Sequence, residues 1–208
     1  FVMLGAGLLW FGWYGFNAGS ALSANVGAAV TFTTTTVATA TAMLSWLLVE
    51  RIRDGHATTL GAASGIVAGL VAITPSCSSV NVVGALAIGA IGGAVCALAV
   101  GLKFKLGFDD ALDVVGVHMV GGLTGTLLIG FLATDEAPAA VKGLFYGGGW
   151  DQLWRQAVGA FAVLAYSFIM TTILALIIKY TIGLRVTEED EASGIDESQH
   201  AETAYELA

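Results

Sequence analysis

The segment Trp10-Phe11-Gly12-Trp13-Tyr14-Gly15-Phe16-Asn17-Ala18-Gly19-Ser20 lies inside an apolar run that extends from Phe1 to Leu22. About 20 helical residues, at about 1.5 Å each, span the hydrocarbon core of a bilayer, which is about 30 Å thick. The run is therefore predicted to be a membrane-spanning helix. At helical spacing it carries one apolar and aromatic stripe that ends in a hydroxyl, formed by Leu9, Trp13, Phe16 and Ser20.

The amino-acid composition is typical of a membrane protein. Of 208 residues, 56% are hydrophobic and 12% are charged, and the mean hydropathy is +0.81. All eight lysines and arginines precede Val186, whereas eight of the sixteen acidic residues follow it, so the net charge of −8 belongs to the last 22 residues. We therefore predict an all-α polytopic membrane protein with an acidic tail, and nothing in the composition indicates nucleic-acid binding.

Six hydrophobic segments predict six transmembrane helices within residues 1–181, followed by a cytoplasmic tail over 182–208. The segments cover residues 2–23, 26–49, 58–74, 80–102, 111–133 and 154–181. The third segment ends at Thr74, because Pro75 lacks a backbone donor and disfavours helix in the residue before it. Seven threonines between residues 31 and 41 are expected to bond back to their own helix.

The positive charges predict the orientation in the membrane. If the six segments alternate in direction, most lysines and arginines fall on one side, and only Lys142 and Arg155 fall on the other. The positive-inside rule makes the first side cytoplasmic, so the tail lies inside and Phe16 and Ser20 lie toward the outer face. Glycines repeat at intervals of four residues in several segments, which predicts closely packed helices.

His118 is the only histidine in a predicted membrane segment. An ionisable ring at membrane depth is costly and tends to mark a conduction route or proton relay; the alternative is a core histidine bonded to a neighbouring helix. Gly122 and Gly125 follow at helical spacing and turn the ring toward a packed seam or a cavity. Asp113, at the start of the same segment, is expected to cap the free amides of the helix.

The sequence predicts no metal site, no disulfide framework and no cofactor. Cys77 and Cys96 are the only cysteines and have no metal-ligand spacing. No set of nucleophile, base and orienting residue indicates an enzyme. The chain begins at Phe1 without a methionine or a signal-peptide pattern, which suggests the interior of a longer protein.

Residues 10–20, WFGWYGFNAGS, resemble the signature of the ammonium transporter family (Amt, related to the Rh proteins). The segment from Asp113 to Gly122, DVVGVHMVGG, resembles the D-x-x-G-V-H-x-x-G-G pattern of the same family. The resemblance implies the last six helices of an eleven-helix inverted-repeat transporter that forms homotrimers. It also implies that His118 is the second of two facing pore histidines, and that the first lies before Phe1.

The resemblance also assigns roles along the expected pathway. Phe16 would gate the outer entrance and Ser20 would help to hold the ion, because an aromatic face attracts a cation and a hydroxyl accepts from an ammonium N–H. Thr74 would lie at the same vestibule. An apolar lining that suits neutral ammonia would follow, formed by Trp13, Leu9 and Val114 together with His118. The alternative for the aromatic residues is a position facing lipid or the membrane interface.

The acidic tail resembles the family from Thr181 onward. By composition alone it would be a disordered segment. By resemblance it folds across the cytoplasmic pore mouth and meets a trimeric PII-type signal protein. Ala201 stands where the family pattern has glycine, which costs free energy if that position needs a positive φ. The regulatory residues expected in this tail are Arg185, Asp196, His200 and Tyr205.

The leading interpretation is transport of ammonium or ammonia across the cell membrane. It comprises recognition at an outer vestibule, deprotonation, and passage of ammonia through a hydrophobic pore that contains a histidine. A potassium ion has no proton to give up, which would explain its rejection. A second interpretation is a non-conducting ammonium sensor or a membrane anchor for a PII-type signal protein. A third is an unrelated channel for a small solute.

Overall fold

The computed structural model describes residues 1–203, and every regular element in that range is helical. The expectation of an all-α chain is confirmed for these residues. The chain forms two compact units, which divide after Ala160 within one long helix. Each unit is described by itself.

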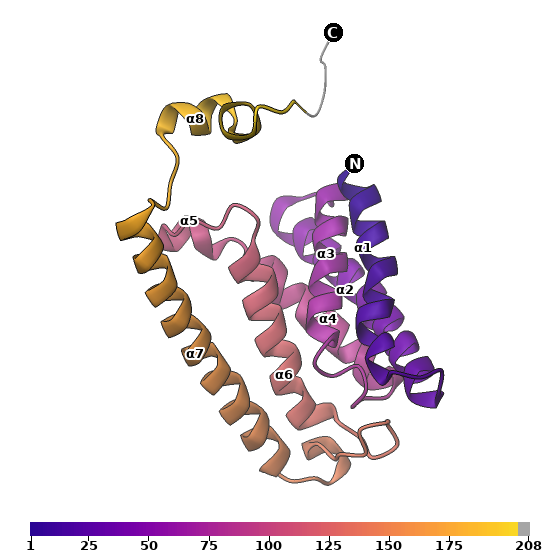
Figure 1. The fold of residues 1–208 in the computed structure, drawn as a ribbon. Coiled ribbons are helices and arrows are strands. Elements are labelled where there is room, and N and C mark those ends of the chain that lie inside the picture. Colours follow the sequence, from indigo (N-terminus) through magenta and orange to yellow (C-terminus); the bar gives the residue numbers. More distant parts are fainter. Residues whose placement is uncertain (204–208) are drawn as a thin grey trace. The chain divides into compact units, whose positions relative to one another are not determined.

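Eight α-helices run through the described residues (Figure 1). In chain order they are α1 (Val2–Asn17), α2 (Val26–Asp54), α3 (Thr59–Ile73), α4 (Val82–Ala99), α5 (Leu102–Leu106), α6 (Val120–Leu132), α7 (Asp151–Thr181) and α8 (Glu188–Ser193). Short 3₁₀ turns cover Gly19–Ala21 and Leu144–Tyr146, and π-helical turns cover Val114–Met119 and Asp196–His200.

Four helices in residues 1–203 are long and apolar enough to cross a membrane. They are Val26–Asp54, Val82–Leu106, Val114–Leu132 and Asp151–Thr181. The apolar helix α3 has 15 residues and α1 has 16, so both are shorter than this criterion requires. The chain thus has the helices of a polytopic membrane protein, but helix length supports four of the six expected spans.

The first helix ends earlier than the sequence suggested. A helix to residue 23 was expected, but α1 stops at Asn17, and a 3₁₀ turn leads to Leu22, whose φ of 54° is left-handed. Asn25 then starts α2, because its side chain accepts from the backbone N–H of Ala28 at 2.9 Å. Sixteen helical residues are about 24 Å long, less than the thickness of a hydrocarbon core.

The helices α2, α3 and α4 pack closely because small residues face one another where they cross. Gly89 lies against the backbone of Ala38, and Gly93 lies against that of Ala42, in both cases without room for a Cβ. Gly69 contacts the backbone of α2 in the same way. The close packing that the glycine spacing predicted is confirmed among α2, α3 and α4, whereas a Cβ at Gly15 or Gly19, which are also four residues apart, would meet nothing within 4 Å.

Five of the seven threonines between residues 31 and 41 donate to carbonyls of their own helix, as expected, Thr34 among them at 3.1 Å to Thr31. Hydroxyls donate to the carbonyl four residues earlier, at 2.7–3.0 Å, from Thr33, Thr36, Thr39 and Thr41. Thr34 additionally donates to the carbonyl of Cys77 at 2.7 Å. This bond ties α2 to the connection between α3 and α4.

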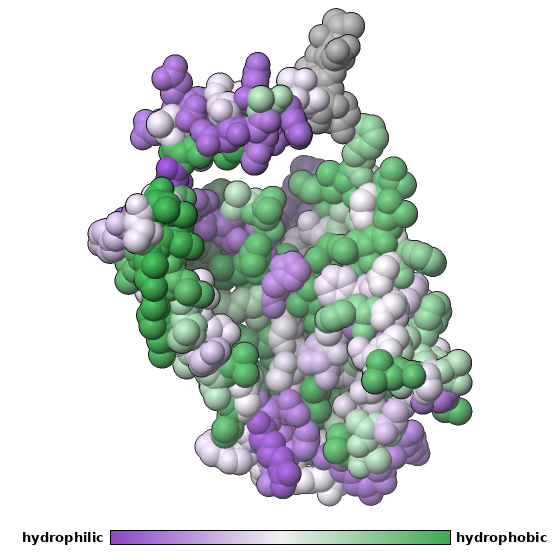
Figure 2. All heavy atoms as spheres, viewed as in Figure 1, coloured by the Kyte–Doolittle hydropathy of each residue, from purple (hydrophilic) through white to green (hydrophobic). Residues whose placement is uncertain are grey.

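Apolar side chains cover much of the outside of the helices. Figure 2 shows hydrophobic residues over most of the visible helical surface, whereas hydrophilic residues cover the acidic α8 segment. Along α7 no residue is buried, although the helix is strongly apolar. A soluble protein would hide such a surface, whereas lipid accepts it.

Candidate functional site

A cavity of about 450 Å³ lies where α1, α2 and the connection after α3 meet, and we call it the Phe16 cavity. Three residues that the sequence singled out line it: Phe16, Ser20 and Thr74. Further polar groups come from Asn17, Asn25, Thr31 and Ser78. No charged side chain is among its lining residues, so a cation that enters meets hydroxyls, amides and an aromatic ring.

Hydrogen bonds of Trp13 and Asn17 fix this part of α1 to its neighbours. Trp13 Nε1 donates to Thr74 Oγ1 at 2.8 Å. Asn17, which is 6% exposed, donates from Nδ2 to Thr35 Oγ1 at 3.1 Å. Its Oδ1 lies 3.2 Å from the hydroxyl of Thr74. The aromatic stripe of α1 is thereby held in a defined position against α2 and the end of α3.

Phe16 and Ser20 lie together at the end of α1. Phe16 is 60% exposed and packs edge-to-face on Trp13, with ring centroids 5.6 Å apart. Ser20 lies beyond the helix, and its hydroxyl donates to the carbonyl of Phe16 at 2.7 Å. Because that bond uses the hydroxyl proton, the serine oxygen keeps lone pairs as acceptors. The pair therefore offers an aromatic face and an acceptor, both of which suit a small cation.

A second cavity, of about 240 Å³, lies among α1, α3 and the π-helical turn Val114–Met119, and we call it the His118 cavity. Both Leu9 and His118 line it, as do Leu112, Asp113 and Val117. Its other walls are mainly apolar and come from Val2, Ala6, Leu60, Ala63, Ser64 and Val67. Leu9, Trp13 and Phe16 share one face of α1 at helical spacing, so Trp13 separates the two cavities along this helix.

The turn that carries His118 is π-helical and leads directly into α6. Its wider hydrogen bond joins the N–H of Val120 to the carbonyl of Val115. Turns of this kind are rare and are often found at functional sites. Because the turn departs from α-helical spacing, Val114 lines neither cavity, although the sequence placed it on the pathway; it is 51% exposed.

The glycines after His118 divide into packed and open positions. Gly121 lies against Cys96, and Gly125 lies against the backbone of Ala72, whereas a Cβ at Gly122 would meet nothing within 4 Å. Of the two surroundings expected for His118, a packed seam or a cavity, the structure has the cavity, and Gly122 does not pack with Gly125 in a seam. The packed seam uses Gly121 and Gly125, which leaves Gly122 in open space.

Asp110, and not Asp113, caps the turn that carries His118. Its carboxylate accepts from the N–H of Val114 at 2.7 Å and from that of Val115 at 2.9 Å. Asp113 makes no side-chain cap bond; it has a left-handed φ of 56°, and its carboxylate pairs with Lys103 at 2.7 Å. The prediction for Asp113 is therefore wrong. The sequence did not predict that Lys103 and Asp110 hold this turn. The only signal for them was their charge near the start of a predicted helix.

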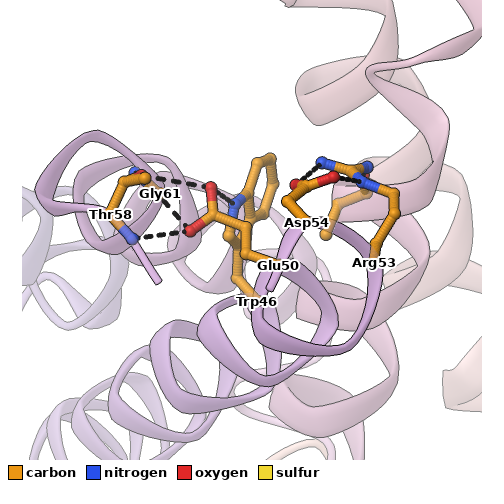
Figure 3. Close-up of polar contacts among 7 residues, drawn as sticks. Trp46, Glu50, Arg53, Asp54, Thr58 and Gly61 are labelled. Atoms are coloured by element: carbon orange, nitrogen blue, oxygen red, sulfur yellow. Dashed lines mark hydrogen bonds and ion pairs between the residues drawn. The ribbon is translucent and has the colours of Figure 1, made fainter. Parts of the chain in front are cut away.

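Glu50 holds the start of α3, which supplies one wall of the His118 cavity (Figure 3). Its carboxylate accepts from the N–H of Thr58 at 3.0 Å, from the Thr58 hydroxyl at 3.2 Å and from Trp46 Nε1 at 3.3 Å. The Thr58 hydroxyl in turn caps the N–H of Gly61 at 2.8 Å. A Cβ at Gly61 would overlap the Glu50 carboxylate, so glycine is needed for this approach.

Beside this cluster, Arg53 ties the ends of α2 and α4 together. Its guanidinium forms a bidentate ion pair with Asp54, at 2.8 and 2.7 Å, and donates to the carbonyl of Ala97 at 2.9 Å. Figure 3 shows the pair next to Glu50. The basic end of α2 is therefore linked to the end of α4 in the first unit.

Both cysteines are free and buried. Cys77 lines the Phe16 cavity and its thiol donates to the carbonyl of Thr74 at 3.3 Å. Burial raises the pKa of the Cys77 thiol to about 11. Cys96 donates to the carbonyl of Val117 at 3.7 Å, next to His118.

The tail, as far as residue 203, is helical in two short pieces and not without regular structure. Thr187 caps α8 by accepting from the N–H of Asp190 at 3.1 Å. Arg185 is exposed, and the exposed Asp196 and His200 begin and end the second π-helical turn. Ala201 has a φ of 55°, so the expected cost of alanine applies there, at about 1–2 kcal/mol. Tyr205 lies outside the described residues.

The comparison with protein families gives one match over nearly the whole chain. The pattern of the Ammonium Transporter Family matches residues 1–205. An ammonium transporter of Mycobacterium tuberculosis is 72% identical over all of this chain, which covers 45% of that protein. An ammonium transporter of Aquifex aeolicus is 50% identical over 99% of this chain and 48% of that protein. The chain thus spans about half the length of the curated relatives it matches.

Solved structures show the same similarity in three dimensions. Mep2 of Saccharomyces cerevisiae superposes with a TM-score of 0.79 at 39% identity, over 89% of this chain and 46% of that chain. A structure described as a sensor Amt protein superposes with a TM-score of 0.85 at 34% identity, over 94% of this chain and 48% of that chain.

Proposed function

Because this chain belongs to the ammonium transporter family, we propose that it forms half of a pathway that carries ammonium or ammonia across a membrane. The family is one of transporters and not of enzymes, and its curated relatives are named accordingly. The observation that carries the proposal is the pair of cavities along α1. One offers an aromatic ring and acceptors, the other an imidazole among apolar walls, and Trp13 lies between them.

The first proposed step is recognition of ammonium at the Phe16 cavity. A ring face attracts a cation by about 0.5–2 kcal/mol, depending on how far the site is desolvated. The lone pairs of the Ser20 hydroxyl accept from ammonium N–H groups, and Thr74 holds Trp13 beside them. Uncharged acceptors suit this step, because a carboxylate would hold the ion too firmly to release it into an apolar passage.

The second proposed step is loss of a proton before passage. A bare cation cannot enter an apolar lining without a large desolvation cost, whereas neutral ammonia can. Past Trp13, the walls that Leu9 helps to form are mainly apolar, with Ser64 and Asp113 as the polar exceptions, and the His118 imidazole can accept a hydrogen bond or a proton. A potassium ion has no proton to lose, so the same lining rejects it.

The whole protein is proposed to complete this pathway and to regulate it. By family resemblance, the other half of the pore brings a second histidine to face His118, the two halves are inverted repeats, and three subunits assemble. The protein is proposed to lie in the cell membrane with a cytoplasmic C-terminus. Four membrane-capable helices support a membrane location. The basic ends of α2 and α5 support the orientation.

The complete protein in proteoliposomes provides the test. His118→Ala removes a hydrogen bond to a charged or polarised group, worth about 1.5–3 kcal/mol, and is expected to change ammonium flux or ammonium-over-potassium selectivity by about 10- to 150-fold. His56→Ala is the matched control, because His56 is exposed in the connection between α2 and α3. Equal flux and selectivity in both variants and the wild type would refute the pore role of His118.

A second candidate function is supported by the superposition on a sensor Amt protein and by the structured acidic tail. In this proposal the protein senses ammonium or anchors a PII-type signal protein without conducting. Deletion from Thr187 onward should leave flux unchanged and abolish binding of a PII-type protein. An intact protein that binds the signal protein and carries no ammonium would favour this function over transport.

A further inference from the structure

Lys103 on α5 makes two bonds where the chain approaches His118. Its Nζ donates to the carbonyl of Asp110 at 2.9 Å and to Oδ1 of Asp113 at 2.7 Å. The side chains of Lys103 and Asp113 are 17% and 35% exposed, so the pair is partly shielded from solvent. One ammonium group therefore holds both ends of the turn from Asp110 to Asp113.

That turn sets the start of the π-helical segment. Asp110 accepts from the first two amides of the segment, and Asp113 immediately before it has a left-handed backbone. Aspartate adopts this conformation more readily than most residues other than glycine, and here the ion pair with Lys103 holds its side chain. Each helical residue turns the chain by about 100° and advances it by about 1.5 Å. If the helix started one residue earlier or later, the imidazole of His118 would therefore point in a different direction.

The other side of the segment is anchored independently. Val117 is 5% exposed, and its carbonyl accepts from Cys96. A Cβ at Gly116 would lie 2.9 Å from the Cα of Val100, so the backbone there is tightly packed. Packing therefore fixes the backbone at Gly116 and Val117, and the bonds of Lys103 determine the position of the start of the segment.

We infer that Lys103 is a positioning residue for His118. Through Asp110 and Asp113, its ammonium group fixes the π-helical turn and so the direction in which the imidazole faces the His118 cavity. Lys103 is not among the residues that line that cavity, so it acts through the turn and not by contact with the substrate. The inference rests on the proposed function, because the position of His118 affects transport only if His118 lines the pore.

The test uses the complete protein in proteoliposomes, with flux normalised to folded protein from size-exclusion chromatography. Lys103→Met keeps the aliphatic stem and removes the charge, Lys103→Arg keeps the charge, and Lys105→Met makes the same change at an exposed position of the same helix. A displaced catalytic or binding group typically costs about 10- to 100-fold in rate. We expect that loss for Lys103→Met, with a changed ratio of ammonium to methylammonium flux. Lys103→Arg should recover to within about threefold of the wild type, and Lys105→Met should match it.

A purely structural role would lower the amount of folded protein and leave the flux ratio unchanged. Lys103→Met protein with wild-type flux per folded molecule, or with an unchanged ratio, overturns the inference. If the wild type itself carries no ammonium, the proposed function fails, and electron cryomicroscopy of Lys103→Met then decides the inference. A 114–119 turn that is still π-helical, with His118 in its original position, overturns it; a rearranged turn supports it.

Discussion

Replacing Gly125 by alanine is expected to destabilise the protein, although alanine is the better helix former. A Cβ at this position would lie 2.7 Å from the carbonyl carbon of Ala72 and closer still to its oxygen, whereas ordinary contact begins at 3.4 Å. The carbonyl carbon alone would require α3 and α6 to move apart by about 0.7 Å, and the nearer oxygen requires more, at a backbone contact that cannot rotate away. Overpacking of this kind costs about 1–3 kcal/mol, more than the gain of about 1 kcal/mol in helix propensity.

Gly122→Ala is the matched control, because it adds the same methyl group to the same helix where nothing lies within 4 Å. We expect Gly125→Ala to lower the thermal midpoint in detergent by several degrees, and Gly122→Ala to leave it unchanged or raise it slightly. Fluorescence-detected size-exclusion after a temperature series measures both. If Gly125→Ala is as stable as Gly122→Ala, then the close approach of α3 and α6 is not as described.

Two further predictions concern the Phe16 cavity. Phe16→Ala should raise the half-saturating ammonium concentration for flux by about 2- to 30-fold, which is the equivalent of the lost cation–π attraction. Phe11→Ala is the control and should leave that concentration unchanged, because Phe11 is exposed on the same helix and lines neither cavity. An equal effect of both changes would argue that Phe16 faces lipid. Because its raised pKa keeps the Cys77 thiol protonated up to about pH 11, a maleimide should not label the folded protein at pH 7, and labelling should follow unfolding in SDS. Rapid labelling of Cys77 in the folded state would contradict its burial.

Helical periodicity was sufficient to group the residues of α1. Phe16 lines one cavity and Leu9 lines the other, and Trp13, which packs on Phe16, lies between them along the helix. Glycine spacing likewise predicted where backbones approach, because only a missing side chain permits that contact. These features follow from local geometry, which a sequence specifies directly.

Features that depend on a departure from the regular helix could not be predicted. The early end of α1 places Ser20 in a 3₁₀ turn, where its hydroxyl bonds back to Phe16. At the π-helical turn, Val114 lines neither cavity, and Asp110 caps the first amides. Both features involve side-chain bonds, such as those of Ser20 with Phe16 and of Lys103 with Asp113, and hydrophobic periodicity carries no information about them.

The hydroxyl of Thr74 has one hydrogen and three close neighbours. Its oxygen lies 2.6 Å from the carbonyl of Leu70 and 3.2 Å from Oδ1 of Asn17, so the two acceptors share one hydrogen, while the indole of Trp13 donates to the same oxygen. The amide oxygen of Asn17 belongs to a nearly buried side chain in the wall of the Phe16 cavity. Under the proposed function, an ammonium ion in this cavity would bring further N–H donors to an oxygen that shares its present donor with Leu70, whereas an alkali ion of the same charge would bring none.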